Sequence, residues 1–219
     1  ILAALLVLPI IILGSWAYLA FFYMLAHSEE GIDLERSFRA TWHKILSWWW
    51  LCLLMSLIIL GGFFLFIVPG IIFAIWFSLY IYVFVSEDLK GMDALLRSKE
   101  YVQGRWWAVF GRGLFLILPL LGVLIVFGIL TTILKVLLPQ EIIAIILSVL
   151  WVGIYIPIYF YHYLIYKACR DTRPQFVGQP PSQKNKGWFV FSAIWGVAPM
   201  VYLIMFLVFV VMALSAVVN

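Results

Sequence analysis

SEDLKGMDALLRSKEYVQGRWWAVFGR, residues 86–112, is the one long stretch in the middle of the chain that a lipid bilayer would exclude. The segments before and after it are apolar over lengths that suit membrane-spanning helices. The position of this stretch relative to a membrane therefore determines where the neighbouring segments lie.

The stretch itself reads as an amphipathic helix. Apolar side chains recur at helical spacing between residues 92 and 106, whereas Asp93, Arg97 and Glu100 fall on the opposite face. Asp93 and Arg97 stand four residues apart with the acid first, which adds about 0.3 kcal/mol to an exposed helix. We expect an elbow helix at 87–105 that lies on the membrane surface with its charged face exposed.

A second elbow is expected at 28–44, where a polar segment with mixed charge leads into Trp48-Trp49-Trp50. The first elbow ends in the same way, at Arg105, Trp106 and Trp107. Basic and tryptophan side chains favour the membrane interface, because each combines an apolar body with a polar tip.

Composition decides the class of protein. Of the 219 residues, 66% are hydrophobic and 11% are charged, and a soluble domain of this size cannot bury so much apolar surface. The net charge of +4 favours anionic lipid headgroups as partners and not nucleic acid, because there is no soluble basic face. We expect an all-α fold, a polytopic integral membrane helical bundle that needs no cofactor.

Six spans are expected, at 1–26, in two arms within 51–85, at 107–134, at 142–166 and at 187–218. The two arms form a hairpin that turns at Gly61-Gly62 or at Pro69-Gly70. A return arm that starts at Pro69 has about 15 residues and spans about 22 Å, too short to cross alone. This favours the turn at Gly61-Gly62, with Pro69 bending the second arm.

By domains, the sequence divides into a multi-span membrane domain at 1–167, a proline-containing linker at 168–187 and an additional transmembrane helix at 188–219. Lys and Arg number three in 27–44, five in 86–112, one in 135–141 and five in 167–186. The rich loops are expected in the cytoplasm, which places the C-terminus outside and implies a further span before residue 1.

Five prolines fall within apolar spans and are expected to bend them: Pro9, Pro69, Pro119, Pro157 and Pro199. They indicate either a polar crevice between bent helices or ordinary bending without a cavity.

Catalytic signals are missing from the sequence. It holds no nucleotide-binding, hydrolase or metalloprotease motif, and its three histidines lack metal-ligand spacing. Cys52 and Cys169 are expected at different depths and therefore unpaired. No expected span carries a charge near its middle, which argues against proton-coupled transport. The sequence therefore leans away from an enzyme.

The first part of the chain resembles a family of multi-span bacterial and archaeal membrane proteins, the glycerophosphoryl diester phosphodiesterase membrane-domain family. The matching residues are Pro69-Gly70, Glu87, Gly91, Ala94-Leu95, Ser98, Val102, Gly104 and Trp106. The resemblance covers about residues 1–167. It implies a membrane domain in a prokaryotic cytoplasmic (inner) membrane, and it transfers no activity because the catalytic barrel found in some members is missing here.

The leading expectation is a non-enzymatic membrane module that engages lipid or a membrane-protein partner, including a second copy, at the cytoplasmic face. The residues expected at lipid headgroups and the interface are Arg36, Arg39, Lys44, Arg97, Lys99, Arg105, Trp106, Trp107 and Arg112. The alternatives are a lipid or amphiphile transporter and the membrane domain of a lipid phosphodiesterase system.

Overall fold

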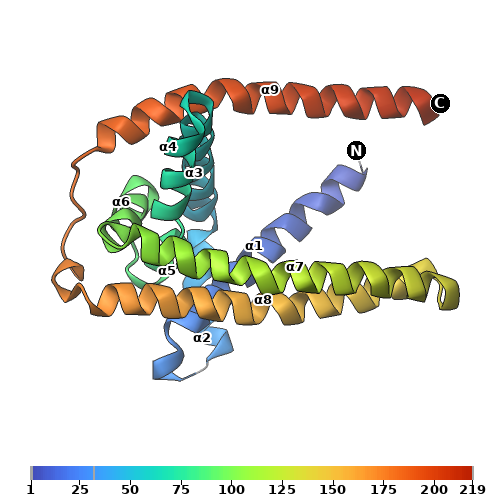
Figure 1. The fold of residues 1–219 in the computed structure, drawn as a ribbon, viewed down its shortest axis with the longest axis horizontal. Helices are drawn as coiled ribbons and strands as arrows, with labels where there is room; N and C mark the ends of the chain where they lie inside the picture. Colours follow the sequence, from blue (N-terminus) through green and yellow to red (C-terminus); the bar gives the residue numbers. More distant parts are fainter. Residues whose placement is uncertain (1, 32, 219) are drawn as a thin grey trace. The chain divides into compact units, whose positions relative to one another are not determined.

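The computed structural model describes residues 2–31 and 33–218, and throughout these ranges the regular structure is helical (Figure 1). Within these ranges, six segments are long and apolar enough to cross a membrane: Val7–Ala26, Leu34–Leu65, Ile67–Ser86, Trp106–Lys135, Gln140–Asp171 and Lys186–Val210. The all-α fold class and the number of candidate spans agree with the expectation from the sequence.

The chain forms two compact units. The core unit contains the described residues of 2–103 and 173–218, and the hairpin unit runs from Gly104 to Thr172. This differs from the division expected from the sequence, which set 188–219 apart from 1–167. The last helix belongs with the first six, and the segment 104–172 is the separate part.

Helix α1 (Leu2–Ala26) packs against the short helix α2 (Leu34–Thr41). The Asp33 side chain caps α2 by accepting a hydrogen bond from the Arg36 N–H at 3.0 Å. The indole of Trp16 in α1 donates to the Phe38 carbonyl at 2.8 Å. A 3-10 turn at Trp42–Lys44 then leads into α3. The elbow expected at 28–44 thus contains a helix, which a hydrogen bond from Trp16 joins to α1.

Helix α3 (Ile45–Leu65) and helix α4 (Ile67–Trp76) form a hairpin that turns at Phe66, whose backbone is extended. The expectation of a turn at Gly61-Gly62 is wrong, because both glycines lie inside α3. Pro69 is the third residue of α4, where the first-turn N–H groups have no intrahelical partner, so it removes no helical hydrogen bond. Pro9, Pro119, Pro157 and Pro199 lie inside helices, as expected.

The returning arm is not one helix. After α4 the chain turns at residues 77–79 and continues as α5 (Tyr80–Ser86). Residues 81–85 are buried, with exposed fractions of 0–5%. Helix α6 (Gly91–Val102) contacts α3, α4 and α5. The expected elbow at 87–105 therefore contains α6, which packs inside the core unit, and its last two residues belong to the hairpin unit.

Helix α9 (Lys186–Val218) crosses α3 at very short range. A Cβ atom on Gly61 would lie 1.7 Å from the Ser192 carbonyl oxygen, and one on Gly196 would lie 1.9 Å from the Leu57 carbonyl oxygen. The Ser192 hydroxyl donates to the Ile58 carbonyl at 2.8 Å. Small residues let helix backbones approach in this way, which explains why α9 joins the core unit.

The hairpin unit consists of α7 (Trp106–Leu137) and α8 (Gln140–Asp171), which lie side by side (Figure 1). Phe127 and Trp151 stack with ring centroids 5.2 Å apart. Many large apolar side chains of both helices are exposed, such as Val126 and Ile145. The two spans expected at 107–134 and 142–166 correspond to these helices.

Candidate functional site

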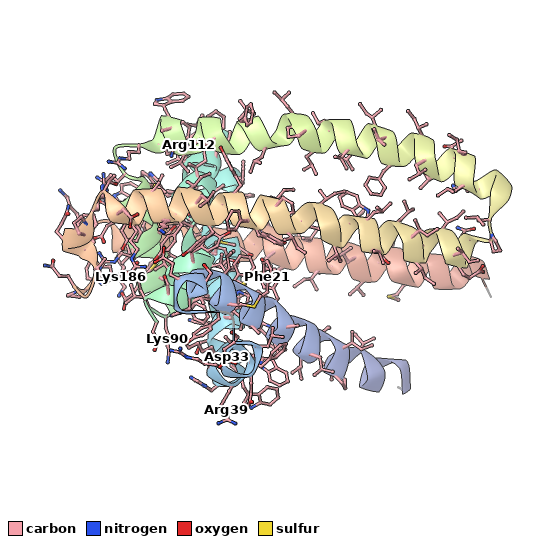
Figure 2. The ribbon with its side chains drawn as sticks, turned by 90° about the horizontal axis from the view of Figure 1, so that it is seen from below. Phe21, Asp33, Arg39, Lys90, Arg112 and Lys186 are labelled. Carbon is pink, nitrogen blue, oxygen red and sulfur yellow. The ribbon has the colours of Figure 1, made fainter. Side chains whose placement is uncertain are left out.

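Three segments that are far apart in the sequence meet in the core unit, and we call them together the polar end: 28–44, 87–103 and 173–186. Lys44 Nζ lies 2.9 Å from Asp88 Oδ1, which joins the first segment to the second. The Ser182 N–H donates to Glu100 Oε1 at 2.6 Å, which joins the second to the third. In Figure 2 the labelled Asp33, Lys90 and Lys186 come from these three segments. The three basic loops of this unit are therefore neighbours.

Arg97 is the centre of the polar end, with an exposed fraction of 1%. Its Nη1 donates to Glu100 Oε2 at 2.9 Å, and its Nη2 donates to the Gln179 carbonyl of the linker. Its Nε lies 3.5 Å from Glu87 Oε2, within ion-pair distance but without a hydrogen bond. Glu87 also accepts from the Tyr101 hydroxyl at 2.6 Å. Arg97 therefore ties α6 to the linker.

The expected exposed pair of Asp93 and Arg97 is wrong. Asp93 instead accepts a hydrogen bond from Gln183 Nε2 at 3.1 Å, and the linker covers the face of α6 that carries Arg97. Phe176 of the linker contacts two guanidinium groups, with Arg97 5.5 Å and Arg173 5.7 Å from the ring centroid. The guanidinium of Arg97 is buried and bonded to Glu100 and Gln179, so it is not exposed to lipid headgroups.

Lys99 is also buried, with an exposed fraction of 5%. Its ammonium lies 5.0 Å from the centroid of the Trp76 ring and 5.2 Å from that of Phe189. Among the described residues, no carboxylate forms an ion pair with it. Burial lowers the pKa of Lys99, Glu100 raises it and repulsion from Lys184 lowers it further. Within the described part of the chain, the Lys99 ammonium therefore lies over two aromatic rings and has no ion-pair partner.

A cavity of about 390 Å³ lies between the α3–α4 turn, α4 and the start of α9. Its lining is largely aromatic: Leu65, Phe66, Pro69, Phe73, Trp76, Asn185, Trp188, Phe189, Phe191 and Ser192. Trp76 and Phe189 line this cavity and also contact the Lys99 ammonium. The cavity thus has a buried cation behind two of its walls.

Four of the five basic residues of the hairpin unit, together with Asp171, lie at one end of it, which we call the hairpin base: Arg105, Arg112, Lys167 and Arg170. Arg105 donates to the Thr172 hydroxyl, so the start of α7 and the end of α8 are adjacent. Arg112 is exposed in the first part of α7 (Figure 2), and Trp107 is 76% exposed. The sequence predicts Arg105 and Arg112 at an interface but not Lys167 or Arg170, whose signal is the basic count in 167–186.

The two units differ in how their charge is balanced. The core unit holds nine Lys or Arg residues against eight Asp or Glu, whereas the hairpin unit holds five against two. In the hairpin unit, Lys135 and Glu141 lie toward the turn, so the base holds four basic residues against one acidic residue, Asp171. Most of the net charge of +4 therefore sits at the hairpin base.

The other residues expected at headgroups divide by exposure. Arg39 pairs with Glu35 at 2.9 Å, and both side chains are 82% exposed. Arg36 is exposed as well, whereas Lys44 is buried and paired with Asp88. Lys44, Arg97 and Lys99 therefore differ from the expectation of an exposed cation.

A second cavity, of about 800 Å³, lies within the hairpin unit between α7 and α8. Pro119 and Gly122 line it on α7, and Gly153 lines it on α8. All of its lining residues are apolar, so it does not match the polar crevice that was one of the two readings of the prolines. Pro9, Pro157 and Pro199 line neither of these two cavities.

Comparisons with known proteins find no match to a family model, to a curated protein or to a solved structure. The resemblance to the phosphodiesterase membrane-domain family therefore stays a prediction. Within the described residues, no group of three or more His, Cys, Asp or Glu is placed to hold a metal ion.

Proposed function

We propose that this protein is a non-enzymatic membrane module that engages anionic lipid headgroups through the hairpin base. In this proposal the membrane is a prokaryotic inner membrane and the basic loops face the cytoplasm. The observation that carries it is the charge balance, five basic residues against two acidic ones in the hairpin unit. A juxtamembrane cation contributes about 1 kcal/mol toward an anionic membrane surface.

The physical setting supports this role. Arg112 is exposed, Arg105 and Arg170 are half-buried, and Trp106 and Trp107 flank them. Tryptophan favours the headgroup depth, which would hold the cations at the level of the phosphates. The core unit contributes less, because Lys44 and Arg97 are already paired within the protein.

The test is lipid selectivity measured by native mass spectrometry, after release of the protein from vesicles of mixed phosphatidylglycerol and phosphatidylcholine. The variant changes Arg105, Arg112 and Arg170 to Gln. We expect the retained ratio of phosphatidylglycerol to phosphatidylcholine to fall about tenfold or more, since three cations at about 1 kcal/mol each are lost.

Lys135→Gln is the matched control, because it removes the same charge at the other end of the same unit and should leave the ratio unchanged. An unchanged ratio in the triple variant would contradict the proposal. A second polypeptide that co-purifies with the wild type at fixed stoichiometry, together with no preference among lipids, would favour a role in binding a membrane-protein partner instead.

A further inference from the structure

We propose that the cavity between α4 and the start of α9 is a binding site for an amphiphile with an alkyl chain and an anionic head, which Lys99 and Lys184 would attract. The site lies in the core unit, so it is independent of the hairpin base. Either proposal can fail without the other.

The cavity suits the chain of such a ligand. Its volume of about 390 Å³ falls within the range of about 300–1,000 Å³ that is usual for small-molecule sites. Its lining follows α4 from Phe66 to Trp76, which is about 15 Å at 1.5 Å per residue. Asn185 and Ser192 are its polar lining residues, so the wall along α4 is apolar.

The cationic end suits the head. A buried ammonium without a counter-ion is costly, and an anion beside it offsets that cost. Two walls of the cavity, Trp76 and Phe189, are the rings that contact the Lys99 ammonium. Lys184 directly precedes Asn185, which lines the cavity, and the linker at 173–186 carries three basic residues and no acidic one.

The neighbouring carboxylates are already engaged. Glu100 accepts from Arg97 with one oxygen and from the Ser182 N–H with the other. Glu87 accepts from Tyr101 and pairs with Arg97, and Asp93 accepts from Gln183. None of these three carboxylates forms an ion pair with Lys99 in the described structure, so an external anion would be its ion-pair partner.

The first turn of α9 adds to the attraction. Asn185, with a positive φ of 73°, and Trp188 line the cavity where this helix starts. The amino end of a long helix carries partial positive charge, which stabilises an anion nearby. Three sources of positive potential, Lys99, Lys184 and this helix end, thus converge at one end of an apolar cavity.

The experiment measures binding of radiolabelled myristate to the full chain in a neutral detergent, by scintillation proximity. We expect saturable binding to wild type, at least tenfold weaker binding to Lys99→Met, and unchanged binding to Lys90→Met. Lys90 is the matched control because it is an exposed lysine that precedes α6. Methionine keeps the volume of the lysine stem and removes only its charge.

A second variant guards against misfolding of the first. Leu65→Trp places a large side chain at the other end of the cavity and should also abolish saturable binding. Equal binding of myristate by wild type and both variants, or equal affinity of wild type for myristate and uncharged tetradecanol, would overturn the proposal.

Competition separates the two possible sources of the ligand. If phosphatidylglycerol in nanodiscs displaces myristate and phosphatidylcholine does not, the site takes one chain of a membrane lipid. If only free fatty acid competes, the site takes a soluble amphiphile. Both results support the cavity as a binding site for an anionic amphiphile. Neither bears on the lipid ratio, which tests the hairpin base separately.

Discussion

The polar end of the core unit and the base of the hairpin unit share one sequence signature, basic residues beside tryptophan, and have opposite structures. In the core unit, Arg97 is buried and its charge is matched by Glu87 and Glu100. In the hairpin unit, Arg112 is exposed and the basic residues outnumber the acidic ones. The difference arises because the linker at 173–186 returns over α6 and covers it. The role of a cation at a membrane interface thus depends on what packs over it.

The largest effect that separates the two regions is expected from Arg97→Met. Removing one partner of a buried ion pair costs about 3–5 kcal/mol, because Glu87 and Glu100 would keep buried charge without a counter-ion. The measurement is the free energy of unfolding in mixed micelles. Arg112→Met is the control and should change stability by less than about 0.5 kcal/mol. Equal losses in both variants would remove the distinction between the two regions.

The next largest effect is expected at the close crossing of α3 and α9 in the core unit. Gly61→Ala would place a Cβ atom 1.7 Å from the backbone oxygen of Ser192, which cannot move like a flexible side chain. Overpacking of this kind costs about 1–3 kcal/mol, so α9 should separate from α3 and the linker should loosen. Proteolysis in the linker, followed with time, measures the loosening.

Gly122→Ala is the control for this substitution, because Gly122 lies in α7 and a Cβ atom added there would meet nothing within 4 Å. It should be neutral or slightly stabilising, since alanine favours a helix over glycine. Linker cleavage at the wild-type rate in Gly61→Ala would contradict the close crossing of α3 and α9.

These residues also show what the sequence could and could not predict. The six spans followed from apolar length and the grouping of the basic loops followed from charge, and both are properties of local sequence. The turn at Phe66 lies between two glycine-containing candidates, and those glycines serve instead for close packing: Gly62 approaches Gly70, and Gly61 approaches Ser192. Glycine alone does not tell a turn from a contact.

The site was predicted less well than the fold, because its contacts join residues that are far apart in the sequence. The burial of Arg97 depends on Gln179, 82 residues later. The surroundings of Lys99 depend on Phe189, on a helix that the sequence places in a separate domain. The periodicity of α6 describes two faces correctly, but it contains no information about the segment that covers the polar one.

A smaller effect distinguishes the two buried cations of α6. Lys99→Met should stay within about 1 kcal/mol of wild type at neutral pH, because the lost cation–π contacts are offset by relief of an unpaired buried charge. The folded state holds the pKa of Lys99 below its unfolded value of 10.5. Protonation therefore disfavours folding, and that cost is fully present below the folded pKa and relieved as pH rises toward 10.5.

The measurement is the stability of wild type relative to Lys99→Met at neutral pH and near pH 10. The stability of wild type relative to Lys99→Met should increase as pH rises. Its stability relative to Lys90→Met, which removes an exposed lysine, should not change with pH. If wild type instead became less stable relative to Lys99→Met at high pH, an anion within the protein would already compensate Lys99.

The smallest effect is expected on α2, and it tests whether exposure or membership of the core unit decides the outcome. Arg39 and Glu35 form an ion pair in the core unit, but both side chains are 82% exposed. Exposed pairs four residues apart on a helix contribute only about 0.3–0.5 kcal/mol, because water screens them. Arg39→Gln should therefore resemble Arg112→Met in the unfolding measurement, and should differ from Arg97→Met by several kcal/mol. A large loss of unfolding free energy in Arg39→Gln would mean that the whole polar end acts as one coupled network. The difference between the two regions would then depend on the unit to which a residue belongs and not on its burial.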